Sequence, residues 1–125
     1  MPLVVLLDIC LFGRGAEAKY GGGLGKPQDP YLIYTAEQMN AIGANPNDWD
    51  KHFKLMADID LSAYTGTDFN IIGINRDNHF KGAFDGSGHT ILNFTYNSTD
   101  TYYIGIFGYV KVENTCIKNG VQFFH

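Results

Sequence analysis

The chain has few of the cysteine and histidine residues that form disulfides and metal sites in small proteins. Its 125 residues include two cysteines, Cys10 and Cys116, and no C-x-x-C pair. The histidines show none of the spacings that metal ligands adopt: His52, His79, His89 and His125. The sequence therefore excludes a disulfide-rich scaffold and a Cys/His zinc site. Because Cys10 falls in an apolar N-terminal segment, Cys116 stands alone, and we expect it to be a small buried hydrophobic residue.

Positive charge is also scarce. Lys and Arg number 9 against 13 Asp and Glu, which gives a formal net charge of -4. Nucleic-acid-binding proteins present a basic patch or stripe, and none is present here. Nucleic acid is therefore excluded as a partner. A content of 45% hydrophobic and 18% charged residues is typical of a folded domain, not of a disordered chain.

Long apolar runs are missing. The longest, Leu3–Phe12, is too short to span a bilayer as a helix, so no transmembrane segment is expected. Its length suits a signal peptide, and Ala16-Glu17-Ala18 follows as a cleavage site. We predict a signal peptide over residues 1–18 and export to the cell surface or the medium, with the true start upstream of Met1. The alternatives are a buried N-terminal strand and a lipoprotein acylated at Cys10.

Glycine and aromatic residues are abundant, with 15 glycines and 14% aromatics, which favours β-structure with tight turns. Residues 19–30 are rich in Gly and Pro and are predicted to be a flexible linker. Thr35 and Gln38 form a capping box at the start of a short helix, Ala36–Ile42. We expect this helix to end at Gly43.

The strongest motif is Phe80–Tyr96. Alternation places Phe80, Gly82 and Phe84 on one strand face, and the turn Asp85-Gly86-Ser87-Gly88 follows. Beyond the turn, Leu92, Phe94 and Tyr96 alternate with polar residues. The residues assigned here to a structural motif are Phe80, Gly82, Phe84, Asp85, Gly86, Gly88, His89 and Ile91.

Similar strand–turn units begin near Phe53, Phe80 and Tyr103, and such a period indicates a solenoid. We predict an all-β fold, a right-handed parallel β-helix whose N-terminal cap, with one short helix, and first coils occupy residues 31–125. The alternative is an antiparallel β-sandwich with hairpins at the glycine turns. Because the chain stops at His125 after an apolar stretch, we expect a fragment of a longer protein.

The chain from Asp29 to Val121 resembles the N-terminal region of bacterial secreted proteins with GLUG-type repeats. The matching segments are Asp29–Ile33, Thr35–Gln38, Phe53–Ser62, Phe80–Ile91 and Ile104–Val110. The resemblance implies coils of a parallel β-helix on large, exported, adhesin-like cell-surface proteins. Some members of that group sit beside catalytic or carbohydrate-binding modules.

No residue set in the chain has a spacing diagnostic of catalysis. Alternation places Asp58 and Asp60 on one strand face, where carboxylates are usually solvated. Asp85 is expected to bond its own turn, and Lys81 and His89 are weak candidates for a base. We therefore expect no catalytic residues, no enzyme activity and no cofactor. Calcium at carboxylate loops remains an open alternative, because loop carbonyls also bind it.

The leading hypothesis is a non-enzymatic, exported structural or adhesion segment of a larger cell-surface protein. Its expected partner is a carbohydrate or another cell-surface protein. One alternative is the N-terminal end of a β-helical polysaccharide lyase or hydrolase. Another is a carbohydrate-binding module in which Trp49, Tyr102 and Tyr103 stack on sugars, although Trp49 in a polar loop is more often a packing anchor.

Overall fold

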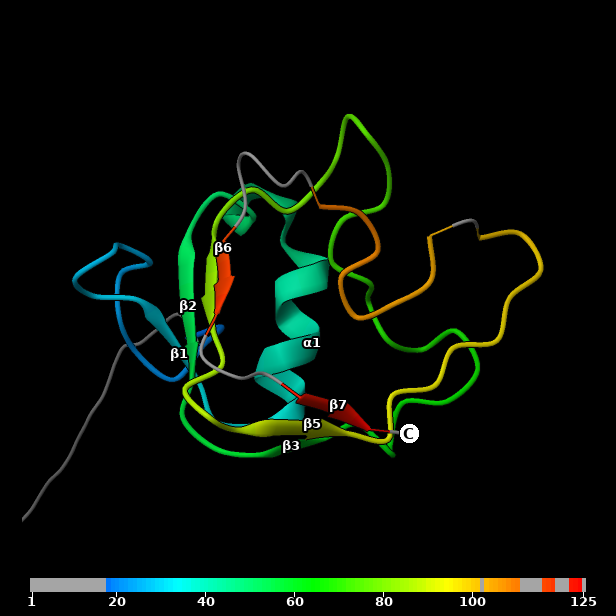
Figure 1. Ribbon diagram of the computed structural model, residues 1–125, viewed down its shortest axis with the longest axis horizontal. Helices are drawn as coiled ribbons and strands as arrows, with labels where there is room; N and C mark the ends of the chain where they lie inside the picture. The colour runs from blue at the N-terminus through cyan, green and yellow to red at the C-terminus, as the bar shows by residue number, and fades with distance from the viewer. Residues whose placement is uncertain (1–17, 102, 111–115, 119–121, 125) are drawn as a thin grey trace, which may run out of the picture.

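Figure 1 shows the computed structural model of the chain, which describes residues 18–101, 103–110, 116–118 and 122–124. The predicted signal peptide, apart from Ala18, and Tyr102 lie outside the described residues. Among the described residues, no helix combines the length and apolar content needed to cross a bilayer.

The described strands form two parallel sheets. The larger sheet has the order β1-β2-β4-β6 and contains β1 (Tyr31–Ile33), β2 (His52–Leu55), β4 (Ala83–Asp85) and β6 (Cys116–Lys118). The smaller sheet has the order β3-β5-β7 and contains β3 (Ile59–Asp60), β5 (Thr90–Leu92) and β7 (Gln122–Phe124). After β1, the strands alternate between the sheets: β2, β4 and β6 lie in the larger one, and β3, β5 and β7 in the smaller one (Figure 1).

Helix α1 (Ala36–Ala44) begins at the predicted capping box. Thr35 Oγ1 accepts a hydrogen bond from the backbone N–H of Gln38 at 3.1 Å, and Gln38 Oε1 accepts from the N–H of Thr35 at 3.2 Å. The helix continues past Gly43, which was expected to end it. A side chain at Gly43 would overlap the backbone carbonyl of Asn70, so glycine is needed there for close packing.

One hydrophobic core joins the helix to both sheets. Met39 and Ile42 of α1 are fully buried in the same cluster as the phenylalanines of the larger sheet. Phe53, Phe80 and Phe84 are also fully buried, and the Phe53 and Phe80 ring centroids lie 6.1 Å apart. Burying each such ring contributes roughly 1.5–3 kcal/mol, so the core fixes how the short elements pack together.

The predicted fold class is wrong. The structure is a small mixed α/β domain with short strands in two parallel sheets, and α1 contributes to its core. The strands are two to four residues long, and irregular segments occupy much of the chain between them. The period of the strand–turn units indicated an all-β, right-handed parallel β-helix, but it carried no information on strand length or on how the helix packs.

The antiparallel β-sandwich is also wrong, because every pairing between the described strands is parallel. The unit predicted to begin near Tyr103 contains isolated parallel bridges in its described part, residues 103–110. These bridges join Ile72 to Phe107 and Phe80 to Val110.

The Gly/Pro-rich segment 19–30, predicted as a flexible linker, is attached to the sheet. The N–H of Gly21 donates to the carbonyl of Leu32 at 2.7 Å, and the N–H of Leu32 donates to Gly22 at 3.0 Å. His52 N–H donates to the carbonyl of Gly25 at 2.9 Å. These bonds hold the segment against β1 and β2. The glycine-rich composition did not predict these hydrogen bonds, because a local pattern does not show which backbone groups find partners.

Candidate functional site

The Phe80–Ile91 motif forms the corner between the two sheets. Ser87 N–H donates to Asp85 Oδ1 at 2.9 Å, and His89 N–H donates to the carbonyl of Gly86 at 2.9 Å. Gly88 has φ +78°, which glycine adopts without strain. Because β4 and β5 lie in different sheets, the turn changes direction and forms no hairpin. Asp85 bonds its own turn, as expected.

The apolar members of this motif lie in the core. Phe80, Phe84 and Ile91 have no exposed surface. A side chain at Gly82 would overlap the backbone carbonyl of Lys51, so this glycine permits β4 to approach the preceding segment. Cys116 is exposed on β6, contrary to the expectation of a buried residue.

Asp58 and Asp60 join β3 to the β5 segment through side-chain hydrogen bonds, which we call the carboxylate clamp. Asp58 Oδ1 accepts hydrogen bonds from Thr90 N–H at 3.0 Å and lies 3.2 Å from His89 Nδ1. Asp60 Oδ1 accepts from Asn93 Nδ2 at 3.0 Å and from a backbone N–H two residues ahead. Both side chains lie on the solvent side, as alternation predicts, yet they cross-link neighbouring strands.

These hydrogen bonds lower the pKa of both carboxyl groups. For Asp58 the main cause is the backbone bond from Thr90, followed by the contact with His89. For Asp60 the main cause is the bond from Asn93. A carboxyl group whose folded-state pKa is lowered stabilises the fold above its unfolded pKa, about 3.9, and loses that contribution as pH falls through the folded value.

We therefore expect the melting temperature to fall on acidification from pH 5 to pH 3. The double variant Asp58→Asn, Asp60→Asn should show a shallower fall, because its amides do not titrate. The matched control is Asp68→Asn, Asp77→Asn, which replaces two exposed carboxylates without side-chain hydrogen bonds among the described residues. Thermal denaturation across this pH range measures the fall in melting temperature. An equal fall in the two double variants would show that the carboxylate clamp does not stabilise the fold.

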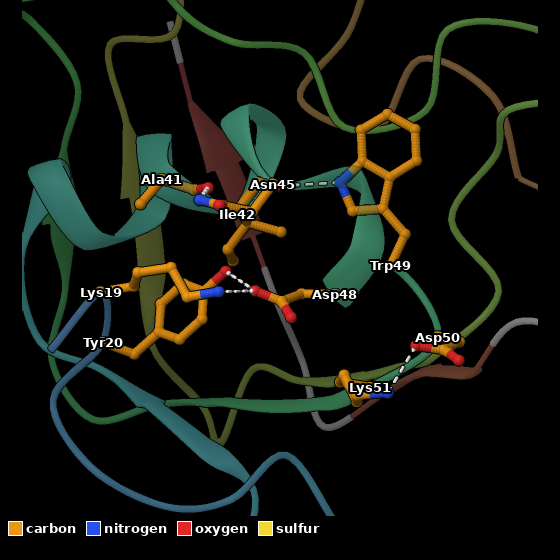
Figure 2. Close-up of polar contacts among 9 residues, drawn as sticks. All are labelled: Lys19, Tyr20, Ala41, Ile42, Asn45, Asp48, Trp49, Asp50 and Lys51. Atoms are coloured by element: carbon orange, nitrogen blue, oxygen red, sulfur yellow. Dashed lines mark hydrogen bonds and ion pairs between the residues drawn. The ribbon is translucent and has the colours of Figure 1, made fainter.

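A buried carboxylate anchors the N-terminal segment. Asp48 is 6% exposed and belongs to the 3₁₀ turn η2 (Pro46–Asp48). Its Oδ2 accepts from Lys19 Nζ at 2.7 Å and from the Tyr20 hydroxyl at 2.9 Å (Figure 2). Burial, and then the bond to Asp48, raise the pKa of Tyr20, so the hydroxyl stays protonated and donates. No local pattern in the sequence indicates this contact, which joins residues 28 positions apart.

Replacing Tyr20 by phenylalanine should lower the free energy of unfolding by about 1.5–3 kcal/mol, the usual range for a hydrogen bond to a charged group. Urea denaturation measures this loss. Tyr34→Phe is the control, since Tyr34 is exposed and its hydroxyl makes no hydrogen bond to a described residue. A loss no larger than that of the control would show that the contact with Asp48 adds nothing.

Trp49 lies in the core instead of on the surface. Its side chain is 4% exposed, and Nε1–H donates to the carbonyl of Ile42 at 2.8 Å, at the end of α1 (Figure 2). A buried indole has no free face for a sugar, so Trp49 packs as an anchor between η2 and α1. Of the three residues predicted to stack on sugars, Trp49 is buried, and Tyr102 lies outside the described residues.

Tyr103, the third of these residues, lies on the surface beside a polar groove. This groove, which we call the tyrosine groove, has a volume of about 540 Å³. Its lining combines two tyrosines and five polar side chains with three apolar ones: Tyr96 and Tyr103, then Thr67, Asn70, Asn75, Asp100 and Thr101, and Phe69, Ile71 and Ile74. The sequence did not predict it, because its residues come from irregular segments far apart in the chain.

A second, apolar groove of about 680 Å³ is lined mainly by Phe94, Tyr96, Ile104, Ile106, Phe107 and Ile117. The carboxylates considered for catalysis line neither groove. Among the described residues, no group of three or more His, Cys, Asp or Glu side chains could hold a metal ion.

Comparisons with known proteins find two relatives. The chain is 38% identical over 110 residues to a protein of Evansella cellulosilytica with the provisional name Gly-rich membrane protein, covering 86% of this chain and 12% of that protein. It is 33% identical over 106 residues to Halomucin of Haloquadratum walsbyi, covering 78% of this chain and 1% of Halomucin. The chain thus spans a small part of each. No family model and no solved structure matches.

Proposed function

We propose that this chain is a non-enzymatic structural and adhesion segment of a larger, exported cell-surface protein. The observation that carries the proposal is the use of its candidate catalytic groups as cross-links. Asp58 is bonded to Thr90 and contacts His89, and Asp60 is bonded to Asn93. A general base must face a substrate cleft, whereas these carboxylates line neither groove and hold β3 to the β5 segment.

The relatives support the surface location. One carries a name that describes a membrane protein, and the other is called Halomucin. In both, the matching region is a small part of a much longer chain. A segment of this kind, used within long surface proteins, fits a structural or adhesive role better than a free-standing enzyme. The resemblance to secreted GLUG-repeat proteins leads to the same proposal.

The location can be tested by brief protease treatment of intact cells that produce the full-length protein. We expect peptides from residues 19–110 to be released into the medium, while a cytoplasmic marker stays inside. Recovery of the protein only after cell lysis would refute surface exposure.

The absence of activity needs a separate assay on uronate polymers, followed by the ultraviolet absorbance of the unsaturated product. We expect no product from the purified chain. A rate that falls in Asp58→Asn would overturn the proposal in favour of a lyase.

A further inference from the structure

The tyrosine groove has the size and the opening of a small-molecule site. Its volume of about 540 Å³ lies within the usual range for ligand pockets, roughly 300–1,000 Å³. One wall comes from residues 67–75 and the other from Tyr96, Asp100, Thr101 and Tyr103, and Gly43 at the end of α1 also lines it. The loop 67–75 is attached to α1, because Asn70 N–H donates to Asn40 Oδ1 at 2.7 Å. This wall is therefore in place before any ligand arrives.

The groove offers hydrogen-bonding groups that the fold does not use. Within the described part of the chain, the Asp100 carboxylate has no hydrogen-bond partner. Asn75 uses Oδ1 as an acceptor for its own loop, which leaves its Nδ2 donor free among the described residues. Asn70 Nδ2 donates to Asn40, which leaves Asn70 Oδ1 as an acceptor. Acceptors and a donor thus lie around one opening, as hydroxyl-rich ligands require.

An exposed aromatic ring stands beside these polar groups. Tyr103 is 44% exposed, and its ring contacts Tyr109 edge-on, with centroids 5.1 Å apart. Tyr109 in turn contacts His79 at 6.2 Å, and His79 Nδ1 lies 2.8 Å from the carbonyl of Arg76. The contact with Tyr109 limits the orientations of the Tyr103 ring before binding, which reduces the side-chain entropy lost on binding.

We infer that the tyrosine groove binds a neutral sugar ring, whose C–H face stacks on Tyr103 and whose hydroxyls bond to Asp100, Asn70 and Asn75. An aromatic face combines an apolar surface with a polar edge, which matches the two sides of a pyranose. The Asp100 carboxylate and the net charge of -4 disfavour uronic acids and other anionic ligands. This inference rests on the proposed adhesive function and names its ligand class.

The test uses saturation-transfer NMR on the chain of residues 1–125 with the methyl glycosides of glucose, galactose and mannose. The methyl glycoside of glucuronic acid is the charged comparison, and amide chemical-shift titration gives the dissociation constants. We expect at least one neutral glycoside to bind and to shift the amides of residues 67–75 and 96–103. The glucuronide should bind more weakly. Tyr103→Ala should weaken binding about tenfold, which corresponds to loss of one stacking contact.

Tyr34→Ala is the matched control, because Tyr34 is 45% exposed and does not line the groove. It should bind as the wild type does. Asp100→Ala provides a second variant whose loss of binding does not depend on removing a ring. Binding unchanged in both Tyr103→Ala and Asp100→Ala, preferential binding of the glucuronide, or no binding of any neutral glycoside would each overturn the inference. None of these three results bears on the protease experiment, which tests surface exposure alone. A failure of sugar binding is therefore distinguishable from a failure of the proposed cell-surface location.

Discussion

Replacing Phe84 by alanine should lower the free energy of unfolding by about 3–5 kcal/mol, the usual loss for a buried phenylalanine. Phe84 has no exposed surface, and its ring meets that of Phe107 edge-on at 5.1 Å. In the larger sheet it stands in register between Phe53 and Ile117. Its removal would leave a cavity where β2, β4 and the segment at Phe107 meet.

Urea denaturation of the wild type and the variant measures this difference directly. Leu24→Ala is the control, since Leu24 is 62% exposed and truncating it should have little effect. A Phe84→Ala variant that unfolds at the wild-type urea concentration would show that the assigned core is wrong.

Trp49→Ala should also destabilise the chain by about 3–5 kcal/mol, because a large buried ring is removed. The substitution also removes one of the two donors to the Ile42 carbonyl, which keeps its hydrogen bond from the Asn45 N–H at 3.1 Å. Trp49→Phe keeps most of the apolar volume and should lose less. Thermal denaturation of both variants gives the ranking.

The same pair of variants separates packing from sugar binding. If Trp49 stacked on a sugar from the surface, Trp49→Ala would abolish glycan binding and leave the melting temperature unchanged. We expect the reverse for Trp49→Phe: a lower melting temperature with glycan binding intact. Retained stability together with lost binding would contradict the buried position of Trp49.

Features that depend on near neighbours in the sequence could be predicted. The capping box at Thr35 and Gln38 requires groups three residues apart, and the structure confirms it. The burial of Phe80 and Phe84 follows from strand alternation and is also confirmed. Alternation fails after Ile91, because Asn93 has φ +62° and shifts the pattern, so that Ile91 and Phe94 are the buried residues.

Features that depend on distant contacts could not be predicted. The period of the strand–turn units did not reveal that α1 packs into the core, so the fold class was wrong. Asp48 meets Lys19 and Tyr20 only in the folded chain, and nothing in the sequence near Asp48 indicates it. The tyrosine groove is made by irregular segments, whose approach no periodicity describes.

The most direct test of this account is the attachment of cells that produce the full-length protein to a surface coated with a neutral polysaccharide. The account predicts that deleting residues 19–125 reduces attachment, that Tyr103→Ala reduces it nearly as much, and that Tyr34→Ala leaves it unchanged. Attachment that survives the deletion at the wild-type level would contradict an adhesive role for this segment.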